Sequence, residues 1–298
     1  MTKETKLKMQ RYCGNVIIIA PLVFMICVCL IPFFVLVSSS FTSNDVIKQG
    51  VVLLPKEPTF LAYKYLFSMP QDIIKSYGVT LLITFLGTIL NIVLCSLIAY
   101  PLSDPEFKYR KIITFFVFFT MLFQAGLIPQ YIVITRLFHL NDTIWILIIM
   151  PLLAPGHILF LKVYFGSLDK TIYESARMDG ASEARILFQV ALPLIKPGLI
   201  TCTFQFVIMY WNDAYTSLYY ADTITPVALY IQRWQTYVQD LSVKASAGML
   251  PFVSSTADVP EKTVQFALGV ITTIPLITIF LVFQKYYVRG LTAGAVKG

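Results

Sequence analysis

Residues 166–197 read GSLDKTIYESARMDGASEARILFQVALPLIKP. This segment is polar and has a helical pattern, and the sequence on both sides of it is apolar. Asp169 can cap a first short helix, and Gly180 allows a sharp turn. Asp179 can cap a second helix that starts at Ala181. We therefore predict a helical hairpin, which is far better organised than a simple connector.

The second helix of this hairpin is predicted to be amphipathic and to end at Pro193 and Pro197. Its apolar residues share one face, so it can lie against a helix bundle while the turn projects away. They are Ile186, Leu187, Val190, Ala191 and Leu194. The basic and acidic side chains of the hairpin cancel, whereas a lipid-bound amphipathic helix is strongly basic. A partner would then recognise the shape of the hairpin.

The composition of the chain indicates a membrane protein. Its 298 residues are 57% hydrophobic and 13% charged, with a mean hydropathy of +0.74. A water-soluble fold carries about 25% charged residues, so most classes of soluble enzyme are excluded. The five cysteines lack the paired spacing of a zinc site or a disulfide framework. His139 and His157 are the two histidines, and we expect no metal site.

Six apolar segments are long enough to cross a bilayer, which requires about 20 residues of helix. They cover residues 15–37, 76–100, 112–134, 143–161, 198–220 and 264–287. The first is too long for a signal peptide and no Ala-x-Ala cleavage site follows it, so we expect a retained helix. We predict an all-α membrane protein with about six transmembrane helices and the hairpin between the fourth and fifth.

Positive charge is distributed unevenly between the two sides of this layout. The side that holds both termini and the hairpin carries 15 of the 23 lysines and arginines, which makes it cytoplasmic. The net charge of +7 then reflects topology and attraction to membrane lipid, and no nucleic-acid partner is expected. The predicted parts are a tail 1–14, a membrane domain 15–288, a tail 289–298, and outer loops 38–75 and 221–263.

Proline and glycine interrupt four of the predicted helices. They are Pro21, Pro32, Gly126, Pro129, Pro151, Pro155, Gly156 and Pro275. Such residues favour a bundle that moves, or they are simple kinks of the kind common in membrane helices. The sequence leaves both alternatives open.

Polar stripes mark two of the predicted helices. In residues 76–100 one face carries Thr84, Gly87 or Thr88, Asn91 and Cys95, and it meets either another helix or a pore. In residues 198–220 a stripe of helical spacing contains Thr201, Gln205, Met209, Asn212 and Thr216, with Tyr210, Trp211 and Asp213 beside it.

Aromatic faces beside amide and carboxylate groups suit a sugar, whose C–H faces stack on rings while its hydroxyls need donors and acceptors. The alternative is an interfacial aromatic belt with an acid that reaches the interface. The candidate substrate-pathway residues are Gln205, Met209, Tyr210, Trp211, Asn212, Asp213 and Asn91.

The hairpin resembles the signature loop of ABC importer permeases, which reads Glu-Ala-Ala, three residues, Gly, nine residues, Ile-x-Leu-Pro. This chain has the same spacing, with Ser175 in place of Ala and Val190 in place of Ile. The resemblance implies a coupling helix in the cleft of an ATPase subunit. The residues implied in coupling are Glu174, Ser175, Ala176, Asp179, Gly180 and Ala181.

The C-terminal segment from Gln284 resembles the tail of the maltose-type (carbohydrate uptake class 1) permeases, which reaches the ATPase subunits. That resemblance implies contacts for Gly290, Leu291, Thr292, Gly294 and Lys297. The pair Trp211-Asn212 is similar to a Trp-Asn pair of the same group. The outer segment 222–262 looks longer than in the maltose permease, which favours a larger oligosaccharide.

The family implies a multi-pass subunit of the bacterial plasma membrane that works with other proteins. Its partners would be a second homologous permease, two ATPase subunits and an extracytoplasmic solute-binding protein that delivers the carbohydrate. The chain has no Gly-x4-Gly-Lys-Ser/Thr phosphate loop, so it cannot be the ATPase, and the resemblance implies a non-catalytic subunit. ATP and magnesium would bind the ATPase partners, and this chain would bind no cofactor.

The sequence is also compatible with other functions. The hairpin is shared by importers of non-sugar solutes, so an amino acid or a polyamine is an alternative substrate. A secondary transporter would need a repeated helix pattern and charges deep in the bundle. An intramembrane enzyme would need a nucleophile and base or metal ligands at membrane depth. The outer-loop aromatics Tyr219, Tyr220, Tyr230, Trp234 and Tyr237 suit a docking surface or an aromatic belt.

Overall fold

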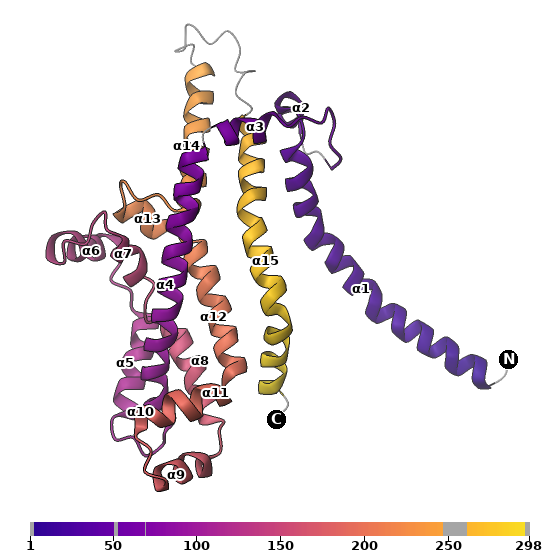
Figure 1. Cartoon of the computed structure of the whole chain (residues 1–298). Coiled ribbons are helices and arrows are strands. Elements are labelled where there is room, and N and C mark those ends of the chain that lie inside the picture. Colours follow the sequence, from indigo (N-terminus) through magenta and orange to yellow (C-terminus); the bar gives the residue numbers. More distant parts are fainter. Residues whose placement is uncertain (1–2, 51–52, 69, 247–260, 296–298) are drawn as a thin grey trace. The chain divides into compact units, whose positions relative to one another are not determined.

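The computed structural model describes residues 3–50, 53–68, 70–246 and 261–295. Every named element within these residues is helical, and one isolated β-bridge joins Thr42 to Pro58. The chain divides into two compact units, whose helices are labelled in Figure 1. Unit 1 comprises Met1–Pro70 and Trp234–Thr273, and unit 2 comprises Gln71–Arg233 and Ile274–Gly298.

Unit 1 is built on long apolar helices joined by short polar segments. It contains α1 (Lys3–Ser40), α2 (Asn44–Gln49), α3 (Leu61–Ser68), and parts of α14 (Val227–Ser246) and α15 (Glu261–Ala295). The apolar side chains of α1 from residue 18 onward are largely exposed, which suits lipid and not water.

Two hydrogen bonds tie the segment after α1 to the start of α15. Lys262 N donates to Asn44 Oδ1 at 3.1 Å, and Thr263 Oγ1 donates to the Thr42 carbonyl at 3.1 Å. These bonds satisfy polar groups at the place where both helices begin or end, and they fix the register of α15 within unit 1.

Unit 2 is a bundle around the long helix α4 (Pro70–Ser103). The chain then passes through α5 (Arg110–Leu122), α6 (Leu127–Ile132), the π-helix η1 (Val133–Leu137), α7 (Ile144–Ile149) and α8 (Pro155–Gly166). The hairpin follows as α9 (Lys170–Met178), α10 (Glu183–Arg185), the π-helix η2 (Ile186–Ala191) and α11 (Leu192–Leu194). The chain continues through α12 (Lys196–Trp211) and α13 (Tyr215–Tyr220) to α14.

Three single helices are long and apolar enough to cross a membrane: Ile18–Ser40, Gln71–Ser103 and Lys262–Gln284. Two bent pairs meet the same test together, Arg110–Leu122 with Leu127–Leu137 at 111° and Glu183–Leu194 with Lys196–Trp211 at 86°. The described residues therefore hold three to five candidate spans of an all-helical membrane protein.

Three of the six expected continuous spans are interrupted, which corrects the sequence-based layout. The expected span 112–134 breaks at Gly126, whose φ of +84° no helix tolerates. The span 143–161 splits into α7 and α8 around Leu153 and Pro155. The span 198–220 ends as a helix at Trp211 and resumes at Tyr215. Apolar periodicity persists through these breaks, so hydropathy alone does not locate them.

The prolines in the long helices, in contrast, do not interrupt them. Helix α1 continues through Pro21 and Pro32, and α15 continues through Pro275. A proline removes one backbone donor, which a long helix accommodates with a bend. These three prolines are therefore at most kinks, whereas Gly126, Pro151 and Pro155 lie at or beside breaks between helices. Whether those breaks allow the bundle to move stays a prediction.

The core of unit 2 joins α4, α8, η2 and α12. Small side chains on α4, Cys95 and Ala99, allow close packing against large ones such as Phe165 and Phe206, and all four are fully buried. The same face of α4 buries Thr84, Thr88 and Asn91. The polar face of this helix therefore packs against other helices of unit 2, which is one of the two alternatives that the sequence left open.

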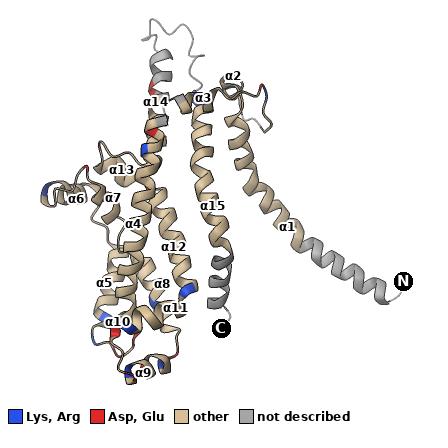
Figure 2. Ribbon diagram, viewed as in Figure 1, with Lys and Arg blue, Asp and Glu red and all other residues tan. Residues whose placement is uncertain are grey.

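Most of the described charged residues of unit 2 lie at the end that holds α9 and α10, and the others lie near α6, α13 and the start of α4. Figure 2 shows lysine, arginine, aspartate and glutamate around α9 and α10, while the middle of α4 and α12 carries none. This separation of charge from apolar helix is the pattern of a membrane protein at its aqueous boundary.

Candidate functional site: the exposed hairpin and the face of α12

The hairpin begins as predicted. Asp169 precedes α9, and its Oδ1 accepts a hydrogen bond from Thr171 N at 3.0 Å. Helix α9 ends at Met178, and Gly180 follows with a φ of +75°. A Cβ at Gly180 would meet no atom within 4 Å, so within this chain the residue is required for its left-handed backbone and not for space.

The second helix starts later than predicted. It begins at Glu183, and its N-cap is Ser182, whose Oγ accepts from Arg185 N at 3.4 Å. Asp179 instead forms the C-cap of α9, where its N–H donates to the Ser175 carbonyl at 3.0 Å. Ser and Asp are comparable N-caps, so residue preference alone did not discriminate between them.

The buried face of this helix agrees with the predicted one except at its end. Ile186, Leu187 and Ala191 are buried in the core of unit 2, and Val190 is half-buried. Leu194 is exposed, because the helix ends there before the 86° bend into α12. The hairpin is thus seated on the bundle by three apolar side chains.

The turn of the hairpin presents the predicted coupling residues together. Glu174, Ser175, Asp179 and Gly180 are exposed, and Ala176 and Ala181 are half-buried. Met178 lies among them with 89% of its surface exposed. Exposed methionine is enriched at protein interfaces, and a single apolar side chain gives no sequence pattern from which Met178 could have been predicted.

Four polar side chains clamp the hairpin to α4 (the hairpin clamp: Tyr100, Asp104, Arg177 and Glu183). Tyr100 OH donates to Glu183 Oε2 at 2.8 Å, and Arg177 Nε donates to Glu183 Oε1 at 2.8 Å. Arg177 Nη2 also lies 3.6 Å from Asp104 Oδ2. The bond to Arg177 lowers the pKa of Glu183, and the same bond raises the pKa of Arg177.

Part of the predicted substrate-pathway set lies inside unit 2. Asn91, Tyr210 and Trp211 are buried. Asn91 Nδ2 donates to Tyr210 OH at 2.8 Å, and Tyr210 OH donates to the Ile148 carbonyl at 2.8 Å. These residues pack helices together in this subunit, and they do not line an open surface of it.

The rest of the set lies on the accessible side of α12 and at its end. Gln205 and Asn212 are exposed, and Met209 and Asp213 are half-buried. Asp213 Oδ1 accepts from Thr216 N at 3.0 Å and so supports the start of α13. The stripe predicted as one constellation is therefore divided between an internal cluster and an outer face, and its role in the pathway stays a prediction.

The predicted tail contacts are placed only in part. Gly290, Leu291, Thr292 and Gly294 belong to α15, whereas Lys297 lies outside the described residues. Within the described residues no group of three or more His, Cys, Asp and Glu side chains could hold a metal ion. His157 packs against the Phe206 ring with 4.3 Å between centroids.

The sequence of the chain matches the model of a protein family over residues 91–293. That family is described as binding-protein-dependent transport system inner membrane component. The chain belongs to this family. It is therefore a permease subunit of the inner membrane, with multi-pass helices and no catalytic site of its own.

Relatives of this permease match it over nearly its whole length. Protein LplC of Bacillus subtilis is 33% identical, over 90% of each chain. The polygalacturonan/rhamnogalacturonan transport system permease YtcP of the same organism is 32% identical, over 91% of this chain and 93% of YtcP. The trehalose/maltose transport system permease MalG of Thermococcus litoralis is 30% identical, over 95% and 97%.

Solved structures give the same fold. A chain of a bacterial ABC transporter involved in the import of the acidic polysaccharide alginate superposes with a TM-score of 0.77. It is 30% identical and covers 96% of this permease and 99% of its own length. The all-helical ABC permease fold is thereby established for this chain.

Proposed function

We propose that this chain is the permease subunit of an ATP-driven importer for an oligosaccharide. Membership in the binding-protein-dependent family makes it a transport component of the membrane. YtcP, MalG and the alginate transporter are each named for a saccharide. These relatives favour a carbohydrate over the amino-acid or polyamine alternative, and no comparison favours a secondary transporter.

The hairpin 166–197 is the element that would couple this permease to ATPase subunits. The observation that supports this role is the exposed turn around Gly180, whose neighbours Glu174, Ser175 and Asp179 are all exposed. Met178 adds an apolar contact at the same place. An exposed apolar side chain within a polar, charge-balanced rim is the composition of a protein interface.

The clamp would carry a displacement of the hairpin to α4. Tyr100 lies on α4, and it is bonded to Glu183 at the start of the second hairpin helix. The buried residues Ile186 and Leu187 pack the same helix onto the core that contains α12. A push on the turn would then move the hairpin, α4 and the cytoplasmic end of α12 as one body, which is the rigid-body form of switching.

The pathway surface would be the exposed face of α12, with Gln205, Met209, Asn212 and Asp213. Amide and carboxylate groups there can bond sugar hydroxyls, while Met209 offers an apolar contact. Asn91, Tyr210 and Trp211 would support this face from behind. Their role would be to hold α12 against α4 and α7.

The outer loops 38–75 and 221–263 would receive a solute-binding protein. In unit 1, Trp234 lies 5.8 Å from the Tyr65 ring and 5.7 Å from the Tyr237 ring, centroid to centroid. Tyr237 is half exposed at 51%. Tyr219 is partly exposed, whereas Tyr220 is buried and stacks on Tyr131. Residues 247–260 of this loop lie outside the described residues.

The complete assembly would contain a second homologous permease and two ATPase subunits that bind ATP and magnesium. Both termini of this chain would face the cytoplasm of a bacterium, with the tail from Gly290 onward near the ATPases. The excess of lysine and arginine on that side supports this orientation.

A comparison of two glycines tests the coupling role. Gly180 and Gly126 both have a positive φ, +75° and +84°, and neither would place a Cβ near another atom. Valine at Gly180 should lower the affinity of the membrane subunits for the ATPase by about tenfold. A left-handed non-glycine residue costs about 1–2 kcal/mol, so the turn should relax away from the conformation that docks, and binding would have to restore it. Gly126→Val, outside the hairpin, should leave that affinity unchanged.

Pull-down of the ATPase subunits by reconstituted permease measures this effect directly. Equal ATPase affinity in both variants would overturn the docking role of the hairpin. The substrate class has a separate test: a solute-binding protein encoded with this permease should bind oligosaccharides, and a binding protein that takes amino acids would overturn the carbohydrate assignment.

A further inference from the structure

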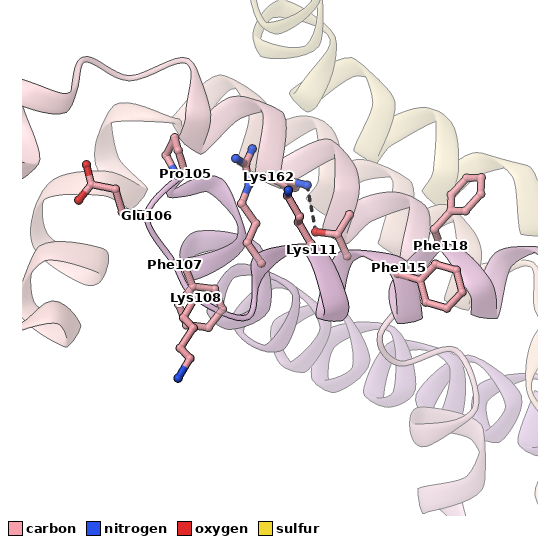
Figure 3. A pocket seen from close by; sticks show the side chains of 10 residues that line it. Pro105, Glu106, Phe107, Lys108, Lys111, Phe115, Phe118 and Lys162 are labelled. Carbon is pink, nitrogen blue, oxygen red and sulfur yellow. Dashed lines mark hydrogen bonds between the residues drawn. The ribbon is translucent and has the colours of Figure 1, made fainter.

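A groove of about 730 Å³ lies in unit 2, between the loop after α4, the start of α5, and α8. Figure 3 shows Phe115 and Phe118 toward one end and Glu106 toward the other, with Lys111 and Lys162 between them. This groove is separate from the hairpin turn and from the exposed face of α12. Nothing in the proposed transport cycle uses it.

Positive charge dominates the lining of the groove. The lining contains Lys108, Arg110, Lys111 and Lys162, against the single carboxylate of Glu106. That carboxylate lies 3.9 Å from Lys170, which is outside the groove. Within the described part of the chain, none of the four basic side chains forms an ion pair. The groove thus holds cationic groups whose charge the chain itself leaves unbalanced.

Neutral groups hold two of these cations in place. Lys162 Nζ donates to Thr114 Oγ1 at 3.1 Å, and Arg110 Nε donates to the Leu102 carbonyl at 3.1 Å. Both basic side chains are half-buried. Cations fixed close together repel one another, and the repulsion is stronger where water is partly excluded. An anion between them would relieve that repulsion.

The opposite end of the groove is apolar and belongs to a membrane helix. Phe115 and Phe118 of α5 are 61% and 49% exposed, and none of the described residues of α5 is buried. Along α5 the surface therefore changes from basic to aromatic within about two turns. A free phosphate would use only the basic end. An amphiphile with an anionic head and an apolar tail would use both.

We propose that this groove binds an anionic phospholipid of the cytoplasmic leaflet. Its phosphate would lie among Arg110, Lys111 and Lys162, and an acyl chain would follow Phe115 and Phe118. Basic pockets between transmembrane helices on the cytoplasmic side are suited to anionic lipid headgroups. The bound lipid would bridge α5 and α8. The assignment of the leaflet rests on the proposed orientation of the chain.

Lipid binding by the assembled transporter tests this inference. The purified assembly is titrated with phosphatidylglycerol in a neutral detergent, and retained lipid is counted by native mass spectrometry. Each basic group contributes about 1 kcal/mol near an anionic lipid, so Lys111→Gln with Lys162→Gln should weaken this binding about 25-fold. Lys111→Arg should keep it. Lys75→Gln, at the other end of α4, removes one positive charge and should have no effect.

Three outcomes would overturn the inference. One is equal binding of phosphatidylglycerol by the wild type and the double variant. Another is full competition by millimolar inorganic phosphate, which would assign the groove to a free anion. The third is loss of the second permease subunit from the double variant with unchanged lipid content, which would assign the groove to a protein interface. Transport activity enters none of these readouts, so they are independent of the coupling role.

Discussion

Asn91 and Tyr210, which are 119 residues apart in the chain, are joined by a hydrogen bond of 2.8 Å in the buried centre of unit 2. The pair lies beside the break between α7 and α8. Asn91 Oδ1 accepts from Leu153 N at 3.0 Å, and Asn91 Nδ2 also donates to the Pro151 carbonyl at 3.3 Å. Backbone groups freed by a broken helix are costly in a membrane, and these side chains satisfy them. Specific side-chain hydrogen bonds therefore stabilise the break between α7 and α8.

Replacement of Asn91 with Leu should destabilise the permease. Leucine is similar in size but leaves Leu153 N without its acceptor, and an unsatisfied buried group costs about 1–3 kcal/mol. The thermal unfolding midpoint of the purified assembly would measure this change. Tyr210→Phe, which removes one hydroxyl, should have a smaller effect. If the midpoint for Asn91→Leu equalled that of the wild type, the hydrogen bonds from Asn91 to the backbone of the break would not stabilise the permease.

Gly87 is needed for the close approach of Tyr210 to α4. A Cβ at Gly87 would overlap the ring of Tyr210, which is 1% exposed and has no room to withdraw. We expect Gly87→Ala to cost about 1–3 kcal/mol through overpacking. Gly78→Ala on the same helix is the matched control, since its Cβ meets no atom within 4 Å. That control should be neutral or stabilising by up to about 1 kcal/mol, because alanine favours helix.

Denaturation of both glycine variants in the same detergent compares these two effects. If Gly78→Ala and Gly87→Ala were equally stable, the packing of Tyr210 against α4 would not be as described.

The clamp residue Glu183 should be required for coupling and not for assembly. Glu183→Gln weakens the bond from Arg177 but keeps the hairpin turn and its exposed residues. We expect normal retention of the ATPase subunits and a fall of about three- to tenfold in ATP-driven uptake, equivalent to about 1 kcal/mol. Arg185→Gln is the control, because Arg185 Nε bonds Gln189 on the same helix segment.

Parallel measurement of ATPase retention and uptake separates the two steps. A Glu183→Gln variant that loses its ATPase subunits would show that the clamp only shapes the docking surface.

Met178 should contribute to docking through its exposed side chain. With 89% of its surface exposed, it adds little to the stability of the permease itself. Met178→Ser should weaken ATPase binding by about three- to tenfold, as expected for an interface residue of moderate importance. Met178→Leu, which keeps the apolar surface, should bind normally. Unchanged binding by the serine variant would exclude this residue from the interface.

The contact between Asp142, before α7, and the segment after α13 should depend on pH. Its carboxylate accepts hydrogen bonds from Thr223 N and Thr223 Oγ1, each at 2.9 Å, and from Asp222 N at 3.0 Å. The bonds from Thr223 are the main reason that the pKa of Asp142 is lowered. A carboxylate with a lowered pKa stabilises the fold above its unfolded pKa, about 3.9, and this stabilisation is lost as the pH falls through the folded value.

The unfolding midpoints of the wild type and Asp142→Asn should therefore differ at neutral pH and converge below about pH 4. If the difference stayed constant across this range, the ionised carboxylate of Asp142 would not be the form that stabilises this contact.

Local chemistry explains what could be predicted about the hairpin. The cap at Asp169 and the turn at Gly180 depend on residues within a few positions, and both were confirmed. The start of the second helix was wrong because Ser182 and Asp179 are comparable caps and neighbouring geometry selects between them. The breaks of the middle spans were missed because proline gives the same sequence signal in α1, where the helix continues.

The amino-acid sequence by itself determined the membrane class, the polar hairpin and the likeness to importer permeases, because these depend on composition, periodicity and fixed spacing along the chain. The tertiary structure alone decided that Asn91 and Tyr210 pair inside the bundle, that Tyr100 holds Glu183, and that Lys111 and Lys162 line one groove. The reason is physical: side chains far apart in sequence meet only through the packing of whole helices. Whether a proline or glycine breaks a helix depends on which neighbouring groups can hydrogen-bond to the backbone that the break exposes.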